Sequence, residues 1–187
     1  MRTFLTVVLL LVAGVVSAQV ARIGVQHSAN ESSVGTAIPI YSREGKTLYL
    51  TCAHVADRQT CVISGAPGRV IARDIDRDVA LVQTTVQVKR VATFGEDLKP
   101  GERFWVGSMA GEKFQSVVGV AVSSRKGNYK SANGWSGAPV GGNGILQAMH
   151  LGRIGEGKLH AHLLPVSQIK EFLKENEKVT ESCIGFT

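Results

Sequence analysis

Apolar residues along most of this chain come in short runs or alternate with polar residues, and turn-forming residues separate the runs. Such short alternating stretches are typical of half-buried β-strands. Closely spaced strands of this kind indicate a barrel or a sandwich. The stretches that we expect to form strands are residues 21–25, 35–41, 47–51, 69–72, 80–84, 103–106, 117–123, 144–151 and 158–163. The pattern therefore predicts an all-β fold.

A different period follows the last expected strand and predicts one helix over residues 165–180. Apolar residues recur there at i, i+3 and i+4, as Ile169, Phe172 and Leu173, which gives the helix one face for packing. Ser167 has the residue type and the place expected for the helix N-cap. One amphipathic helix is therefore expected after the strands.

The first 18 residues have the pattern of a secretory signal peptide. Arg2 precedes an apolar run from Phe4 to Val16, and small residues follow up to Ala18. The run of 13 residues is shorter than the roughly 18 that a membrane-spanning helix needs. We expect cleavage after Ala18 and a secreted or periplasmic protein without stable membrane insertion. An uncleaved anchor is the alternative.

Length and composition limit the classes of protein to which this chain can belong. With 187 residues, 44% of them hydrophobic and 19% charged, the chain can form one compact domain or two small lobes, and a disordered protein is excluded. The formal net charge is +6, but the longest basic runs are pairs such as Lys89-Arg90 and Arg125-Lys126. Nucleic-acid binding needs a clustered basic surface, so no nucleic-acid partner is expected.

Three cysteines, Cys52, Cys61 and Cys183, would enter an oxidising compartment after export. At most one disulfide can form within the chain, and three pairings are open. Cys52 and Cys61, which are nine positions apart, are kept as a possible pair. No C-x-x-C motif and no zinc-like spacing of Cys and His occurs in the sequence, so we expect no metal site.

Three segments carry residue types suited to acyl-transfer chemistry. The apolar stretch L-Y-L-T-C-A ends at His54, and Asp78 leads directly into the apolar stretch V-A-L-V. Ser136 lies between glycines in the segment G-W-S-G-A-P-V. Acyl transfer by a serine needs a nucleophile, a base that removes its proton and a carboxylate that orients the base. The three segments supply one of each.

These segments, in the order His, Asp, Ser, resemble those of the chymotrypsin-like serine proteases. T-C-A-H at 51–54 is similar to the family's T-A-A-H, and D-V-A-L at 78–81 is similar to its D-x-A-L. G-W-S-G-A-P-V at 134–140 is similar to its G-D-S-G-G-P-V. L-L-P-V-S at 163–167, followed by a helix, also resembles the end of the protease domain in bacterial high-temperature-requirement proteases.

The resemblance covers essentially the whole chain after residue 18 and implies a division of the chain. We expect two antiparallel β-barrels of the chymotrypsin type, at residues 19–93 and 103–164. The polar break at 94–102 would link them, and the helix would follow the second barrel.

The resemblance also assigns a role to each segment. His54 is the general base and acid, Asp78 orients it, and Ser136 is the nucleophile. The backbone amides of Gly134 and Ser136 form the oxyanion hole. Such an enzyme needs no cofactor, and its partners are protein or peptide substrates.

Two neighbouring acids, Asp74 and Asp76, compete with Asp78 for the role of orienting carboxylate. Asp78 is preferred because it alone stands immediately before the apolar stretch.

The strand after the serine is where this family forms its specificity pocket. A-M-H-L-G at 148–152 resembles the G-x-H-x-G strand of glutamyl endopeptidases and of viral proteases that cleave after Gln or Glu. The resemblance places His150 and Gly152 against the bound side chain, and Lys130 at the base of the pocket. A histidine can donate a hydrogen bond to a carboxylate or amide oxygen. The alternative is that His150 is an ordinary half-buried strand residue and Lys130 a solvent-facing loop cation.

We therefore predict a secreted serine endopeptidase that prefers Glu or Gln on the acyl side of the scissile bond. The alternative from another class is a catalytically silent homologue that uses the fold as a protein-binding module. An esterase of the α/β-hydrolase fold is excluded, because it would need G-x-S-x-G after a parallel strand and the order Ser, Asp, His.

Overall fold

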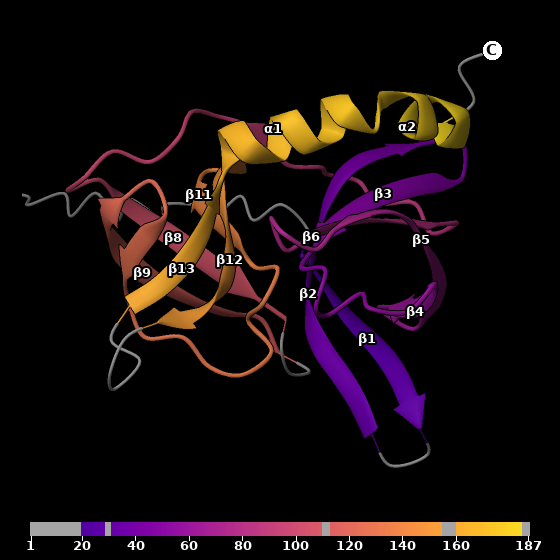
Figure 1. Cartoon of the computed structure of the whole chain (residues 1–187), viewed down its shortest axis with the longest axis horizontal. Coiled ribbons are helices and arrows are strands. Elements are labelled where there is room, and N and C mark those ends of the chain that lie inside the picture. The colour runs from indigo at the N-terminus through magenta and orange to yellow at the C-terminus, as the bar shows by residue number, and fades with distance from the viewer. Residues whose placement is uncertain (1–19, 29–30, 110–112, 155–159, 185–187) are drawn as a thin grey trace, which may run out of the picture.

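The computed structural model describes residues 20–28, 31–109, 113–154 and 160–184, which form two neighbouring barrels and two C-terminal helices (Figure 1). The predicted all-β fold with helix after the strands is confirmed. No helix among these residues is long and apolar enough to cross a bilayer. The expected signal peptide at 1–18 lies outside the described residues.

The first barrel is closed and antiparallel, in the order β1-β2-β3-β6-β5-β4, with β4 paired back to β1. Its strands are β1 (Ala21–Ser28), β2 (Glu31–Arg43), β3 (Lys46–Thr51), β4 (Thr60–Ile63), β5 (Ala66–Asp74) and β6 (Val79–Thr84). Apolar side chains fill its interior, among them Ile23, Ile38, Leu48, Leu50 and Leu81. This order makes β3 and β6 neighbours although β4 and β5 separate them in sequence.

The second barrel is also closed, in the order β11-β8-β9-β10-β13-β12, because β11 pairs with β12. Its strands are β8 (Arg103–Ser108), β9 (Gln115–Ser123), β10 (Lys126–Asn128), β11 (Pro139–Gly142), β12 (Ile145–Ile154) and β13 (His160–Pro165). The two-residue β7 (Thr93–Phe94) runs parallel to β12 and adds a seventh strand to this sheet. Phe104, Val106, Val140 and Leu163 are buried in its core.

Each of the nine expected strand segments overlaps a strand of the structure, but β4, β7, β10 and β11 were not predicted. These four strands have only two to four residues, too few to show a period of two. Residues 126–128, whose sequence Lys-Gly-Asn is typical of a turn, form β10, and β11 begins with a proline and ends with two glycines. Short strands rich in Gly and Pro are therefore difficult to distinguish from turns in the sequence.

Two helices, α1 (Val166–Glu175) and α2 (Glu177–Ile184), follow β13 where we expected one. The predicted packing face is confirmed, because Ile169 and Phe172 are buried in a core cluster that joins residues of both barrels. The predicted cap is wrong: Pro165 occupies the N-cap position. Ser167 instead donates from its backbone N and its Oγ to the carboxylate of Asp97, at 2.8 and 2.6 Å. A carboxylate from a distant segment therefore binds the first turn of α1.

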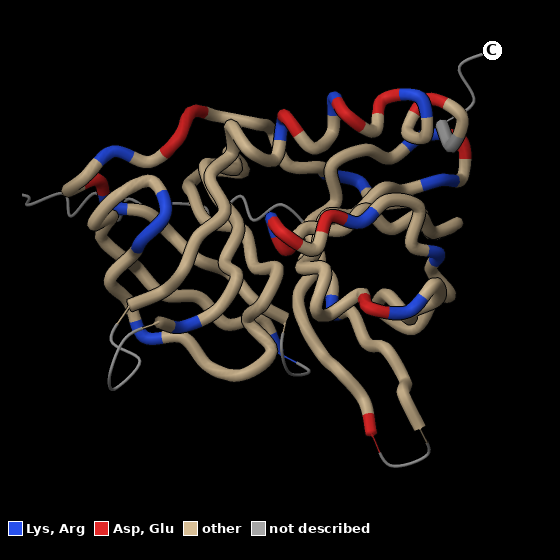
Figure 2. Tube along the Cα trace, in the orientation of Figure 1, with Lys and Arg blue, Asp and Glu red and all other residues tan. Residues whose placement is uncertain are grey.

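Charged residues occur on both barrels and on the helices (Figure 2). Helix α1 has an apolar side with Ile169 and Phe172 buried and a charged side with Lys170, Glu171, Lys174 and Glu175 exposed.

Candidate active site

His54 and Asp78 lie at neighbouring strand ends of the first barrel. His54 is in the turn that follows β3, and Asp78 directly precedes β6, which pairs with β3. The Nδ1 atom of His54 is 2.7 Å from Oδ2 of Asp78, and the backbone N of His54 donates to Oδ1 at 2.9 Å. The two hydrogen bonds fix the carboxylate against both the ring and the backbone of His54.

Asp78 has an unusual backbone conformation for a residue other than glycine, with φ at 54°. Such left-handed residues are tolerated by Asp but persist only where surrounding contacts hold them. Of the two competing acids, Asp74 binds Arg77 and Asp76 is exposed. The carboxylate that faces His54 is therefore that of Asp78.

The electrostatics of His54 follow from this contact. The hydrogen bond that His54 donates to Asp78 raises the pKa of His54 above its ordinary value, although partial burial acts in the opposite direction. The His54 side chain is 51% exposed and that of Asp78 is 26% exposed. With Nδ1–H committed to the carboxylate, Nε2 is the ring atom that can accept a proton.

Ser136 lies in a tight turn between two glycines with left-handed backbone, Gly134 (φ 81°) and Gly137 (φ 87°). Ala138 N donates to Trp135 O at 2.9 Å across the turn. A Cβ on Gly137 would lie 2.0 Å from the backbone oxygen of Thr36, so no larger residue fits there. The glycines that marked this motif in the sequence are thus required by the turn and by its close approach to the first barrel.

Backbone contacts dock this turn onto the first barrel. Thr36 on β2 donates from its N to Ser136 O at 2.8 Å, and its Oγ1 donates to Gly134 O at 3.3 Å. Thr51, the last residue of β3, donates from Oγ1 to Thr36 O at 2.8 Å. The Ser136 turn of the second barrel is therefore held beside the strand end that leads to His54.

The hydroxyl of Ser136 donates to Leu151 O on β12 at 3.1 Å, and no hydrogen bond joins it to His54 in the described structure. Catalytic hydrogen bonds are often long or absent in free enzymes and form only with substrate. The amides of Gly134 and Ser136 have no acceptor within the described part of the chain. They are thus free to donate to a bound oxyanion.

His150 lies on β12 beside the turn that carries Ser136. Its backbone N donates to Ala138 O at 2.9 Å and its O accepts from Gly137 N at 2.8 Å. The side chain is 2% exposed, and Nδ1 is 2.6 Å from the hydroxyl of Tyr129. Burial lowers the pKa of His150 to about 4. The ring is therefore neutral near pH 7, and its Nδ1 shares one hydrogen bond with the Tyr129 hydroxyl.

The other predicted pocket residues are less constrained. Lys130 is exposed and makes no hydrogen bond or ion pair with any described residue. Gly152, also on β12, has no atom within 4 Å of the position that a Cβ would take, so space is open beside it.

Tyr129 and Ser131 are two buried hydroxyl residues of the second barrel that the sequence pattern did not indicate. Tyr129 binds His150 and packs edge-on against Phe104, with ring centroids 5.6 Å apart. The Oγ of Ser131 is buried without a partner among the described residues. Nothing in the local sequence distinguishes these hydroxyls from exposed ones, because their burial depends on pairing between distant strands.

The possible disulfide between Cys52 and Cys61 is absent: both cysteines are free and buried. Cys52 follows β3 and its Sγ contacts His150 O at 3.4 Å, whereas Cys61 is on β4. Two strands, β6 and β5, separate β3 from β4 in the barrel, and this separation keeps the thiols apart. The side chain of Cys183 lies outside the described ones.

We expect Cys52 and Cys61 to be alkylated in denaturant without any reductant. In the native protein the reaction should be slow, because both thiols are buried and burial raises the pKa of Cys61 to about 11. Peptide mass mapping after alkylation measures this. Recovery of a disulfide-linked peptide containing either residue would contradict the assignment.

Cys52, His54 and Asp78 each offer a metal-ligating atom, and these atoms lie within 4.8 Å of one another. Burial raises the pKa of Cys52 well above its ordinary value, and the nearby Asp78 raises it further. The Nδ1 atom of His54 is already bound to Asp78. Metal binding by this cluster would need the Cys52 thiolate, so we assign no metal to it.

Comparison of the sequence with models of known families and with curated proteins finds no match in either case. The family resemblance therefore rests on the motifs and on the architecture. The two closed six-stranded antiparallel barrels have the layout of the chymotrypsin-like fold.

Proposed function

We propose that this protein is a secreted serine endopeptidase in which His54, Asp78 and Ser136 act together. The observation that carries the proposal is the pair of hydrogen bonds between His54 and Asp78, at 2.7 and 2.9 Å. The pair lies beside a glycine-bounded turn that is docked on the same barrel and carries Ser136. The signal-like sequence at 1–18 supports export.

The mechanism follows from these positions. The Ser136 hydroxyl leaves Leu151 O and attacks the substrate carbonyl, while His54 Nε2 takes the hydroxyl proton. Asp78 stays ionised and stabilises the imidazolium that forms. The free amides of Gly134 and Ser136 stabilise the oxyanion. His54 then protonates the leaving amine, and water hydrolyses the acyl-enzyme by the reverse sequence of proton transfers.

The specificity proposal rests on His150 and Tyr129. We infer that Tyr129 donates to Nδ1, so that the neutral imidazole carries its proton on Nε2 and presents it as a hydrogen-bond donor. Such a donor suits the side-chain oxygen of Gln or Glu. Because the pKa of His150 is lowered to about 4, the ring carries no charge near pH 7. The ring itself therefore favours Gln at least as much as Glu, and any added attraction for Glu would come from Lys130.

We expect peptides with Gln or Glu before the scissile bond to be cleaved faster than peptides with Arg or Phe there. In His150→Ala the preference should fall roughly 10- to 100-fold, the value of a hydrogen bond worth about 1.5–3 kcal/mol. Tyr129→Phe, which keeps the ring but removes the hydroxyl, should weaken the preference less. A peptide library profiled by mass spectrometry measures this, and identical profiles for the three proteins would overturn the pocket assignment.

The alternative, a catalytically silent binding module, is favoured by one observation: the Ser136 hydroxyl is bound to Leu151 and not to His54. Labelling with a fluorophosphonate separates the two functions, because only an activated serine reacts. An adduct mapped to Ser136 supports the peptidase. Absence of an adduct in correctly folded protein supports the binding module.

A further inference from the structure

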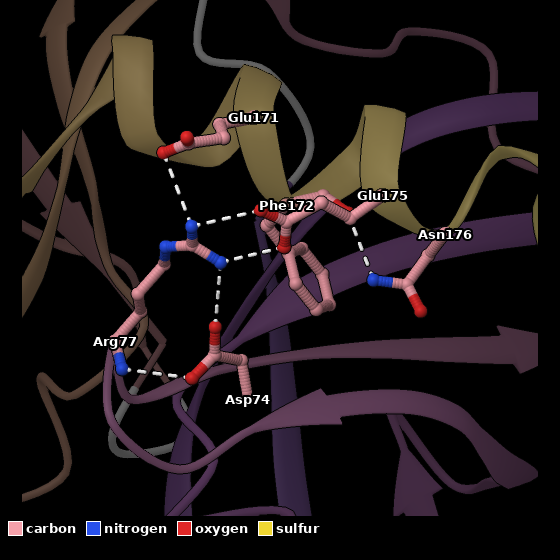
Figure 3. A network of polar contacts seen from close by, with 6 residues as sticks. All are labelled: Asp74, Arg77, Glu171, Phe172, Glu175 and Asn176. Atoms are coloured by element: carbon pink, nitrogen blue, oxygen red, sulfur yellow. Dashed lines mark hydrogen bonds and ion pairs between the residues drawn. The ribbon is translucent and has the colours of Figure 1, made fainter.

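Arg77, the residue before Asp78, is enclosed by three carboxylates (Figure 3). Its Nη1 donates to Asp74 Oδ2 at 2.7 Å and to Glu175 Oε2 at 2.7 Å. Its Nη2 donates to Glu175 Oε1 at 2.9 Å and lies 3.1 Å from Glu171 Oε2. The contact with Glu175 is a bidentate pair, the geometry in which a guanidinium is most selective.

These contacts connect elements that are far apart in the chain. Glu171 and Glu175 are one turn apart on α1, whereas Asp74 ends β5 of the first barrel. The backbone N of Arg77 also donates to Asp74 Oδ1 at 2.9 Å. The loop between β5 and β6, which ends at Asp78, is thus bound both to its own strand and to the helix that follows the second barrel.

Helix α1 is itself firmly placed. Ile169 and Phe172 are buried in the core, Ser167 binds Asp97, and Lys170 Nζ donates to Gly95 O at 2.7 Å. The helix can therefore serve as a fixed support for Arg77.

The electrostatics agree with a persistent network. Hydrogen bonds from Arg77 lower the pKa of Asp74 and of Glu175 below their ordinary values. Both carboxylates therefore stay ionised, and the contacts stay formed, at moderately acidic pH.

Asp78 needs such support because its backbone is left-handed, a conformation that costs a residue other than glycine about 1–3 kcal/mol. One side of Asp78 is continuous with β6, and the other side is the loop that Arg77 holds. We propose that Arg77 is a positioning residue, and that α1, through Glu171 and Glu175, holds the Asp78 carboxylate in place for His54. This inference rests on the proposed function, although one of its tests does not.

The test compares Arg77→Gln and Glu175→Gln with two controls, Arg69→Gln on β5 and Glu181→Gln on α2. Both control residues are exposed and have no contact with Arg77. Displacement of Asp78 should lower kcat on the order of 10- to 100-fold with little change in KM, since substrate contacts are untouched. Arg77→Lys, which keeps the charge but not the bidentate geometry, should be intermediate. The controls should match wild type.

A second readout is the pKa of His54, measured by NMR titration of the imidazole in a Ser136→Ala background. The pKa of His54 should fall toward its ordinary value of 6.5 in Arg77→Gln, because the hydrogen bond that His54 donates to Asp78 is what raises this pKa. The other groups near His54, namely Asp57, His150 and Cys52, are unchanged in these variants.

The outcomes separate the two proposals. If Arg77→Gln lowers the pKa of His54 but the protein with Ser136 intact has no peptidase activity, the positioning role is supported and the proposed function is rejected. A lower melting temperature with wild-type kcat and an unchanged His54 pKa would overturn the positioning role, because Arg77 would then contribute to stability alone. If Arg77→Gln does not fold, Glu175→Gln decides, since the Glu175 side chain is 48% exposed.

Discussion

Ser136→Ala is expected to lower kcat for peptide hydrolysis by about 10⁶-fold, because no other group can form the acyl-enzyme. The fold should be retained: the contacts that hold the turn are made by the backbone of Ser136 and Gly134 and not by the hydroxyl. Only the bond from Oγ to Leu151 O is lost. Initial rates with a peptide substrate and a circular dichroism spectrum measure the two properties.

Ser116→Ala is the matched control, because Ser116 is an exposed serine on β9 of the same barrel. It should hydrolyse substrate at the wild-type rate. Equal rates for wild type and Ser136→Ala would show that the measured hydrolysis has another origin, such as a contaminating enzyme.

Asp78→Asn should lower kcat by about 10⁴-fold while leaving the backbone in place. The amide cannot accept the Nδ1–H bond in the same way, so His54 is held in the wrong tautomer and its imidazolium is not stabilised. Asp76→Asn, an exposed neighbour in the same loop, should behave as wild type. Steady-state kinetics of the two variants decide which acid is used, and a loss in Asp76→Asn alone would reject Asp78.

The same variant should change the dependence of rate on pH. Under the proposed function His54 acts as a base, so activity should fall as pH decreases through its pKa. Asp78 raises that pKa in the folded protein. Removing the negative charge lowers it, and the acid limb of the residual activity should therefore move to lower pH. A limb that stays in place would mean that another group controls it.

Local patterns in the sequence predicted the strands with several alternating residues and the apolar face of α1, since those features depend on the residues themselves. The resemblance of the motifs to the chymotrypsin-like family, and not a local pattern, implied that Asp78 would meet His54; the structure brings the two together because their stretches pair as β3 and β6. This pairing is the part of the candidate site that the sequence predicted best.

Features that depend on distant strands could not be predicted. The thiols of Cys52 and Cys61 are separated by the barrel order, and Tyr129 meets His150 only when the second barrel closes. The network around Arg77 has no local sequence signal, because its partners on α1 are 94 and 98 positions away. The direction of the Ser136 hydroxyl is a rotamer choice for which the sequence has no signal.

The docking of the Ser136 turn on Thr36 also has a consequence for the chain while it is being synthesised and exported. The first barrel contains His54 and Asp78, and the second supplies Ser136 more than fifty residues after Asp78. Because the N-terminal part of a chain folds first during synthesis, a half-made or half-exported molecule has a base without a nucleophile. Under the proposed function, the base and the nucleophile would come together only when the fold is complete.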